Sequence, residues 1–130
     1  MSKFTDYKFQ PFLREAIREL GFESPTPIQK EIIPLILRGT SAIGQAHTGT
    51  GKSHSFLIPI AERTDSSTEN VQAVIVAPTR ELATQLFDEL SKITKETAIR
   101  SSLLIGGTDK DRSASRLKSN PHIVVGTPGR

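Results

Sequence analysis

The strongest chemical signal in this sequence is a glycine-rich segment at residues 46–53, Ala-His-Thr-Gly-Thr-Gly-Lys-Ser. Glycines let the backbone turn its N–H groups toward phosphate oxygens, a lysine beside them reaches the β- and γ-phosphates, and a following hydroxyl can ligate Mg²⁺. The segment therefore predicts a phosphate-binding loop in which Lys52 and Ser53 carry the chemistry and Ser53 holds Mg²⁺. Its residues are Ala46, His47, Thr48, Gly49, Thr50, Gly51, Lys52 and Ser53.

A second interpretation of this segment stays open from the local motif. The generic phosphate loop begins with glycine, whereas this one begins with Ala46, and a glycine-rich turn with a lysine beside it by chance has the same composition. The three histidines, His47, His54 and His122, have no cysteine or carboxylate at ligand spacing. We expect them to be solvated or packed side chains rather than metal ligands.

The elements that must position this loop follow from apolar spacing and turn residues. We expect helices over residues 11–20, 26–38, 52–61, 79–93 and 109–117, with a kink at Pro34, and strands over residues 41–44, 71–77, 99–105 and 122–125. Strands that alternate with helices predict an α/β fold, because parallel neighbours need crossover connections. No linker or repeat interrupts the chain, so we expect one domain with one core.

Composition excludes several other classes of protein. The chain has 130 residues, 35% hydrophobic and 24% charged, with a net charge of +3 and no cysteine. A disulfide scaffold, a thiolate zinc site and a cysteine nucleophile are therefore excluded. The apolar runs are shorter than the roughly 18 residues of a spanning helix, and the first residues lack the apolar stretch of a signal peptide. We expect a soluble, cytoplasmic protein with no membrane partner.

Taken in order, several blocks resemble the DEAD-box RNA helicases of the bacterial type. They are Phe12, Gly21-Phe22, Pro-Thr-Pro-Ile-Gln at 25–29, the phosphate loop, Pro-Thr-Arg-Glu-Leu-Ala at 78–83, Gly106-Gly107 and Thr-Pro-Gly-Arg at 127–130. In that family the loop commonly begins with alanine, and Ser53 keeps the hydroxyl of the usual threonine. The resemblance implies a RecA-like P-loop domain whose parallel sheet is flanked by helices, with ATP and Mg²⁺ as cofactors and RNA as the partner.

The resemblance also implies how the base of ATP is recognised. Gln29 resembles the glutamine that reads adenine, Phe22 the aromatic that lies against the base, and Phe12, seventeen residues before Gln29, an upstream aromatic that supports the site. Two structural alternatives remain: Thr26 and Gln29 also fit a helix capping box, and both phenylalanines could be ordinary core residues. The implied division is an adenine-recognition segment at 1–30 and the first part of the ATP-binding domain at 31–130.

Three further blocks resemble the segments that hold the RNA backbone in this family. Contacts to phosphate from arginine, hydroxyls and backbone N–H groups do not depend on base sequence, and glycines permit close approach. The alternative is local: Thr79 caps a helix and Arg80 forms a surface ion pair. The implied RNA-binding residues are Pro78, Thr79, Arg80, Gly106, Gly107, Thr127, Pro128, Gly129 and Arg130.

The function implied is that of the N-terminal ATP- and RNA-binding part of an enzyme that couples ATP hydrolysis to RNA duplex remodelling. The acidic tetrad Asp-Glu-Ala-Asp occurs nowhere in the sequence, and Arg130 stands just before its place in the family. We therefore expect a RecA-like domain truncated before this motif, without the second RecA-like domain, and inactive in hydrolysis by itself. The alternatives are a non-catalytic nucleotide- or RNA-binding module and, less in keeping with the residues at 25–29, a DNA helicase with a phosphate loop.

Overall fold

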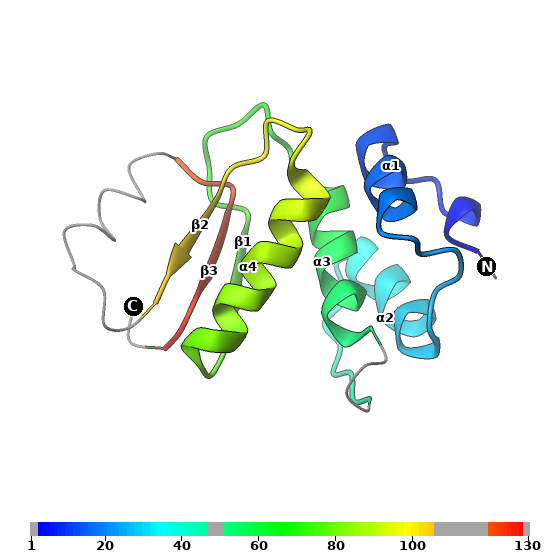
Figure 1. Ribbon diagram of the computed structural model, residues 1–130, viewed down its shortest axis with the longest axis horizontal. Helices are drawn as coiled ribbons and strands as arrows, with labels where there is room; N and C mark the ends of the chain where they lie inside the picture. Colours follow the sequence, from blue (N-terminus) through cyan, green and yellow to red (C-terminus); the bar gives the residue numbers. More distant parts are fainter. Residues whose placement is uncertain (1–2, 47–50, 106–119, 129–130) are drawn as a thin grey trace. The chain divides into compact units, whose positions relative to one another are not determined.

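The computed structural model describes residues 3–46, 51–105 and 120–128 (Figure 1). The chain divides into two compact units, Met1–Arg63 and Thr64–Arg130. Apolar side chains are buried in both units, for example Leu13 and Ile33 in the first and Leu90 and Val125 in the second. The predicted boundary at residue 30 separates an adenine-recognition segment from the ATP-binding domain and not two packing units. It stays a prediction.

The first unit is helical in its described part. It contains the 3-10 helix η1 (Phe4–Asp6) and the helices α1 (Pro11–Glu19), α2 (Pro27–Leu37) and α3 (Lys52–Arg63). α2 packs along α3, and α1 contacts both η1 and α3. The three expected helices are confirmed, and α2 runs through Pro34. In α1 the buried side chains, Leu13, Ala16 and Ile17, lie on the predicted apolar stripe.

The strand expected at residues 41–44 is wrong. Residues 41–46 have no regular secondary structure, and the side chain of Ile43 is 95% exposed. Instead of pairing with a strand, this segment runs beside α2: a Cβ placed on Gly44 would lie 3.2 Å from the Cδ1 atoms of Ile28 and Ile32. A short apolar run becomes a strand only when another strand supplies hydrogen-bond partners.

The second unit is a three-stranded parallel sheet with one long helix packed on it (Figure 1). Its elements are β1 (Ala73–Val76), α4 (Arg80–Thr94), β2 (Ser101–Leu104) and β3 (Ile123–Gly126). The strand order is β1-β3-β2, and α4 contacts β2 and β3. The α/β fold with a parallel sheet and flanking helices is therefore confirmed. The helix expected at 109–117 lies outside the described residues.

One buried histidine ties together the amino-terminal side of this sheet. His122 is fully buried, its Nδ1 accepts from the N–H of Arg100 at 2.9 Å, and its Nε2 lies 2.8 Å from the carbonyl oxygen of Thr68. A backbone N–H can only donate, so Nδ1 is the acceptor and Nε2 carries the proton. His122 is thus a packed, fully paired histidine, as expected.

In the described ranges, no helix is long and apolar enough to cross a membrane.

Candidate nucleotide and nucleic-acid binding sites

The buried carboxamide of Gln29 joins the start of α2 to the phosphate-binding segment. Its Oε1 accepts from the N–H of Thr26 at 2.9 Å, while the Thr26 hydroxyl accepts from the N–H of Gln29 at 3.4 Å. This reciprocal pair is the capping box that the sequence allowed. In addition, Nε2 of Gln29 donates to the carbonyl oxygen of Gly51 at 3.1 Å. One side chain therefore caps a helix and contacts the end of the loop at 46–53.

At position 51, a residue larger than glycine would displace the Gln29 side chain. The φ of Gly51 is +80°, in the region where only glycine is unstrained. A Cβ at this position would lie 2.3 Å from Nε2 of Gln29. The close approach of backbone to carboxamide therefore depends on the absence of a side chain.

The two residues assigned to phosphate and metal begin α3. Lys52 is exposed and Ser53 is half-buried in the first turn, where the helix dipole favours negative charge. The hydroxyl of Ser55 donates to the carbonyl of Lys52, so it belongs to the turn rather than to a ligand. Ala46, at the other end of the loop, is half-buried. The next four loop residues, His47, Thr48, Gly49 and Thr50, lie outside the described residues.

The aromatic residue assigned to the base contacts two other rings. The centroids of Phe22 and His54 are 5.0 Å apart with their planes at 79°, an edge-to-face arrangement. Phe4 lies 6.3 Å from Phe22 with a tilt of 32°. Phe4 in turn contacts Tyr7, which stacks on Phe9. Burial raises the pKa of the Tyr7 phenol.

Phe12 is not among the rings that contact Phe22. It is half-buried on α1 and makes no ring contact within the described part of the chain. The buried aromatic that contacts Phe22 is Phe4, which lies in η1. Phe4 stands eighteen residues before Phe22 in the chain, a separation that no local pattern of residues indicates. The role of Phe12 stays a prediction.

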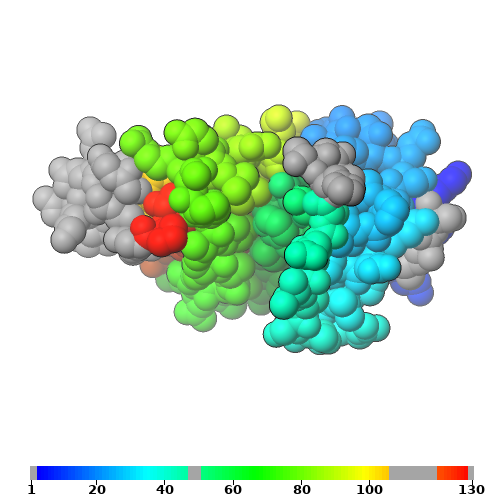
Figure 2. Space-filling model, turned by 90° about the horizontal axis from the view of Figure 1, so that it is seen from below, coloured from blue at the N-terminus to red at the C-terminus, as the bar shows by residue number. Residues whose placement is uncertain are grey.

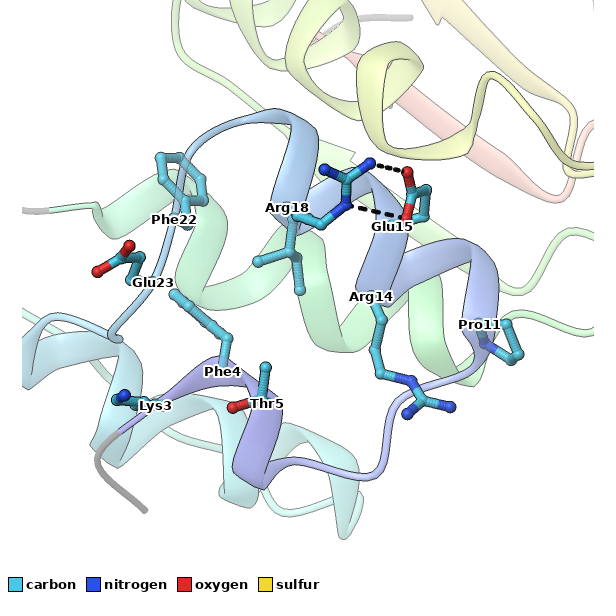
Figure 3. A pocket seen from close by; sticks show the side chains of 10 residues that line it. Lys3, Phe4, Thr5, Pro11, Arg14, Glu15, Arg18, Phe22 and Glu23 are labelled. Carbon is cyan, nitrogen blue, oxygen red and sulfur yellow. Dashed lines mark hydrogen bonds and ion pairs between the residues drawn. The ribbon is translucent and has the colours of Figure 1, made fainter.

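A cavity of about 580 Å³ borders this aromatic group between η1 and α1 (Figure 3). Phe4, Phe22 and Glu23 lie on one side of it, and Arg14, Glu15 and Arg18 of α1 on the other. The Arg18 guanidinium donates to the Glu15 carboxylate, and this hydrogen bond lowers the pKa of Glu15. Gln29 does not line the cavity. The cavity therefore lies beside Phe22 and not beside the Gln29 carboxamide.

In the second unit, the predicted RNA blocks follow the carboxyl ends of adjacent strands. The register pairs Val76 of β1 with Gly126 of β3, and Gly126 with Leu104 of β2. Pro78 and Thr79 therefore leave the sheet at the same edge as Thr127 and Pro128. Figure 2 shows the end of β3, in red, beside the start of α4, in green. Of the other predicted residues, Gly106, Gly107, Gly129 and Arg130 lie outside the described residues.

Close strand approach at this edge depends on Gly126. Its Cβ would lie 2.6 Å from the carbonyl oxygen of Leu104, which accepts from the N–H of Thr127 at 3.1 Å. On the other side, the N–H of Ala77 donates to the carbonyl of Gly126 at 2.9 Å. These bonds hold the segments that follow β1 and β3 next to one another.

At the same edge, Thr79 caps α4 and Arg80 is exposed, with no side-chain hydrogen bond or ion pair to another described residue. The Thr79 hydroxyl accepts from the N–H of Leu82 at 3.1 Å, which confirms the cap. Arg80 and Glu81 are exposed, and no ion pair joins them in the part of the chain that the structure describes. Within the described residues the surface ion pair of the alternative is therefore not seen, and the RNA-binding role of Arg80 stays a prediction.

Neither unit holds a group of three or more histidine, cysteine, aspartate or glutamate side chains placed for a metal ion, as far as residues 3–46, 51–105 and 120–128 are concerned.

Comparison with known proteins gives consistent results. Residues 26–130 match the family DEAD/DEAH box helicase. The chain is 55% identical to the DEAD-box ATP-dependent RNA helicase CshB of Bacillus cereus over 131 residues, which are 98% of this chain and 30% of that protein. It is 53% identical to CshB of Listeria monocytogenes over 99% of this chain and again 30% of that protein.

A solved structure agrees with these sequence matches. The crystal structure of a DEAD box protein from the hyperthermophile Methanococcus jannaschii superposes with a TM-score of 0.88 at 38% identity, covering 100% of this chain and 36% of that one. The fold is therefore RecA-like, as expected. The chain spans about a third of the length of these relatives, and it belongs to the DEAD/DEAH box helicase family.

Proposed function

We propose that this chain is the N-terminal ATP- and RNA-binding part of an RNA helicase that couples ATP hydrolysis to the remodelling of RNA duplexes, in the cytoplasm. The observation that carries the proposal is the hydrogen bond of 3.1 Å between Nε2 of Gln29 and the carbonyl of Gly51. It brings the side chain suited to adenine to the end of the segment suited to phosphate. The alternative of a non-catalytic module is less favoured, since the relatives are named ATP-dependent RNA helicases.

The first unit supplies what a nucleotide needs. Gln29 keeps one N–H and one lone pair beyond its two intramolecular bonds, which matches the acceptor N7 and donor N6 of adenine. Phe22 supplies an aromatic face, and the start of α3 supplies Lys52 for the phosphates.

The donor set at the start of α3 also fits Mg²⁺. This ion prefers oxygen ligands and keeps several waters, so one hydroxyl plus phosphate oxygens suffices to hold it. Ser53 would provide that hydroxyl. When bound, Mg²⁺ neutralises charge on the phosphates.

The second unit supplies a surface for an RNA backbone. Thr79, Arg80, Thr127 and Pro128 meet at one sheet edge, with an exposed guanidinium and the start of α4 among them. Arginine, hydroxyls and helix N-termini bind phosphate without reading sequence. We therefore infer contacts that do not depend on the RNA sequence.

The experiment is a titration of the chain with a fluorescent ATP analogue in the presence of Mg²⁺. We expect Lys52→Ala to abolish detectable binding, because the lysine ammonium is the side-chain charge that faces the triphosphate. Lys8→Ala, which removes an exposed lysine of the same unit, should bind like the wild type. Equal affinities for the wild type and Lys52→Ala would remove the phosphate-loop assignment.

A further inference from the structure

We propose that His54 is a positioning residue of the nucleotide site, whose imidazole holds the Phe22 ring in the orientation that meets the base. The proposal rests on the proposed function, because it requires Phe22 to lie against a nucleotide base.

The first support is the geometry of the two rings. Their centroids are 5.0 Å apart and their planes stand at 79°, which is the edge-to-face arrangement that aromatic pairs prefer. Both side chains are half-buried. An edge-to-face contact restricts the tilt of a ring. His54 therefore limits the tilt of the Phe22 ring, and this tilt must match a base that stacks on it.

The second support is the place of His54 in the chain. It follows Lys52 and Ser53 directly in the first turn of α3. The residue that contacts the base-side ring and the residues that face the phosphates therefore belong to one turn of one helix. Through this turn, the distance between the aromatic face and the phosphate site is set by helix geometry rather than by loop conformation.

The third support is the empty space on the other side of Phe22. The ring borders the cavity of about 580 Å³, and its neighbour there, Phe4, is 6.3 Å away between centroids and tilted. The N–H of Phe22 donates to the carbonyl of Ile17 at 3.2 Å, which holds the backbone, while the orientation of the ring depends on the side chains around it. Without the imidazole, the Phe22 ring has room to turn toward the cavity.

The test separates base binding from phosphate binding. Calorimetric titrations measure the dissociation constants of ATP and of inorganic tripolyphosphate, both with Mg²⁺, for the wild-type chain, His54→Ala and His54→Phe. We expect His54→Ala to weaken ATP binding by roughly two- to tenfold, the range of an aromatic pair. Tripolyphosphate binding should not change, and His54→Phe, which keeps an aromatic ring, should restore ATP binding to within about twofold of the wild type.

Three results would overturn the proposal. Unchanged ATP binding in His54→Ala would show that the ring contact is not needed, and an equal loss for both ligands would place its effect in the phosphate loop. A failure of His54→Phe to restore binding would show that something other than the ring matters. If His54→Ala does not melt cooperatively, His54→Leu, which keeps apolar volume without a ring, replaces it with the same expectations.

A fourth variant distinguishes this proposal from the proposed function. Phe22→Ala should weaken ATP binding at least as much as His54→Ala. If Phe22→Ala binds ATP normally while Lys52→Ala does not, phosphate binding stands and the His54 proposal falls. If Lys52→Ala also binds normally, the nucleotide-binding function itself falls, and the His54 proposal falls with it.

Discussion

At the scale of single residues, Gln29 serves two purposes that the sequence presented as alternatives. A carboxamide has two N–H donors and an oxygen with two lone pairs. Gln29 uses one lone pair for the N–H of Thr26 and one N–H for the carbonyl of Gly51. One donor and one acceptor position remain, so helix capping does not prevent adenine recognition.

Gln29→Glu separates the two purposes. Glutamate at the third position of a capping box still accepts from the N–H of Thr26, so the cap is kept, but its buried carboxylate faces the Gly51 carbonyl and we expect a lower melting temperature than that of the wild type. A carboxylate cannot donate to Gly51 or to N7 of adenine, so the preference for ATP over GTP should fall by roughly 5- to 150-fold. Competition between ATP and GTP together with a thermal melt checks both.

Gln29→Ala is the matched control, because it removes both purposes. We expect it to lose the nucleotide preference and, in addition, about 1 kcal/mol of stability from the lost cap. A Gln29→Glu chain that keeps full preference for ATP would show that the carboxamide is purely structural.

Gly51→Ala should disturb the nucleotide site more than its cost in backbone strain implies. Alanine at a positive φ costs about 1–2 kcal/mol, and at position 51 its Cβ must also displace the Gln29 carboxamide from 2.3 Å. Gly39 has nearly the same φ, +78°, and its Cβ would meet only the Arg63 guanidinium at 3.6 Å. We therefore expect Gly39→Ala to lower stability alone and Gly51→Ala to lower ATP selectivity as well. The same selectivity in both variants would contradict the contact.

At the scale of elements, the start of α4 combines a structural cap with an exposed cation. Because Thr79 caps the helix and Arg80 makes no side-chain bond to another described residue, Arg80→Ala should leave the melting temperature unchanged and weaken binding of single-stranded RNA of any sequence. Loss of one phosphate contact on a single strand should lower the slope of log K against log salt by about 0.7. Filter binding at several salt concentrations measures it.

Lys92→Ala is the control for Arg80→Ala. Lys92 is an exposed cation in the last turn of the same helix, about 18 Å from Arg80 at 1.5 Å per residue. It should change neither the affinity nor the slope. Equal slopes in the two variants would show that Arg80 contributes only to the overall charge.

The sequence predicted strands correctly where a β-rich run has another β-rich run to pair with. It failed where the segment has a helix beside it. The runs at 71–77, 99–105 and 122–125 all contain strands, since three β-rich segments can pair with one another. The run at 41–44, Ser-Ala-Ile-Gly, is also short and apolar but is not a strand, because it lies beside α2. The apolar pattern of a segment shows which side chains it can bury. Whether the segment forms a strand depends on whether another strand lies beside it.

The candidate sites divide in the same way. Side chains with local partners, such as Thr26, Gln29 and Thr79, were predictable as caps from spacings of three residues. The ring contacts of Phe22 with Phe4 and His54 cross eighteen and thirty-two positions, and no local pattern indicates them.

At the scale of the whole molecule, the sheet carries an apolar surface that is open to solvent. β1 alternates: Ile75 is 7% exposed, while Val74 and Val76 are 65% and 64% exposed. β1 is also an edge strand in the order β1-β3-β2. An exposed valine pair on an edge strand is a surface on which chains associate.

Replacing both valines with lysine should therefore reduce association of the chain without unfolding it. Exposed strand positions tolerate polar residues at a cost below about 1 kcal/mol, and lysine on an edge strand opposes pairing between chains. The control is Ile75→Lys, which buries a charge and should cost more than about 2 kcal/mol. Light scattering at increasing concentration and thermal melts of the three chains give the comparison. We expect Val74→Lys/Val76→Lys to scatter less than the wild type and to melt within a few degrees of it, whereas Ile75→Lys should lose its cooperative transition. If the double variant unfolds like Ile75→Lys, the valine face is covered in solution, and an association of chains or units already buries it.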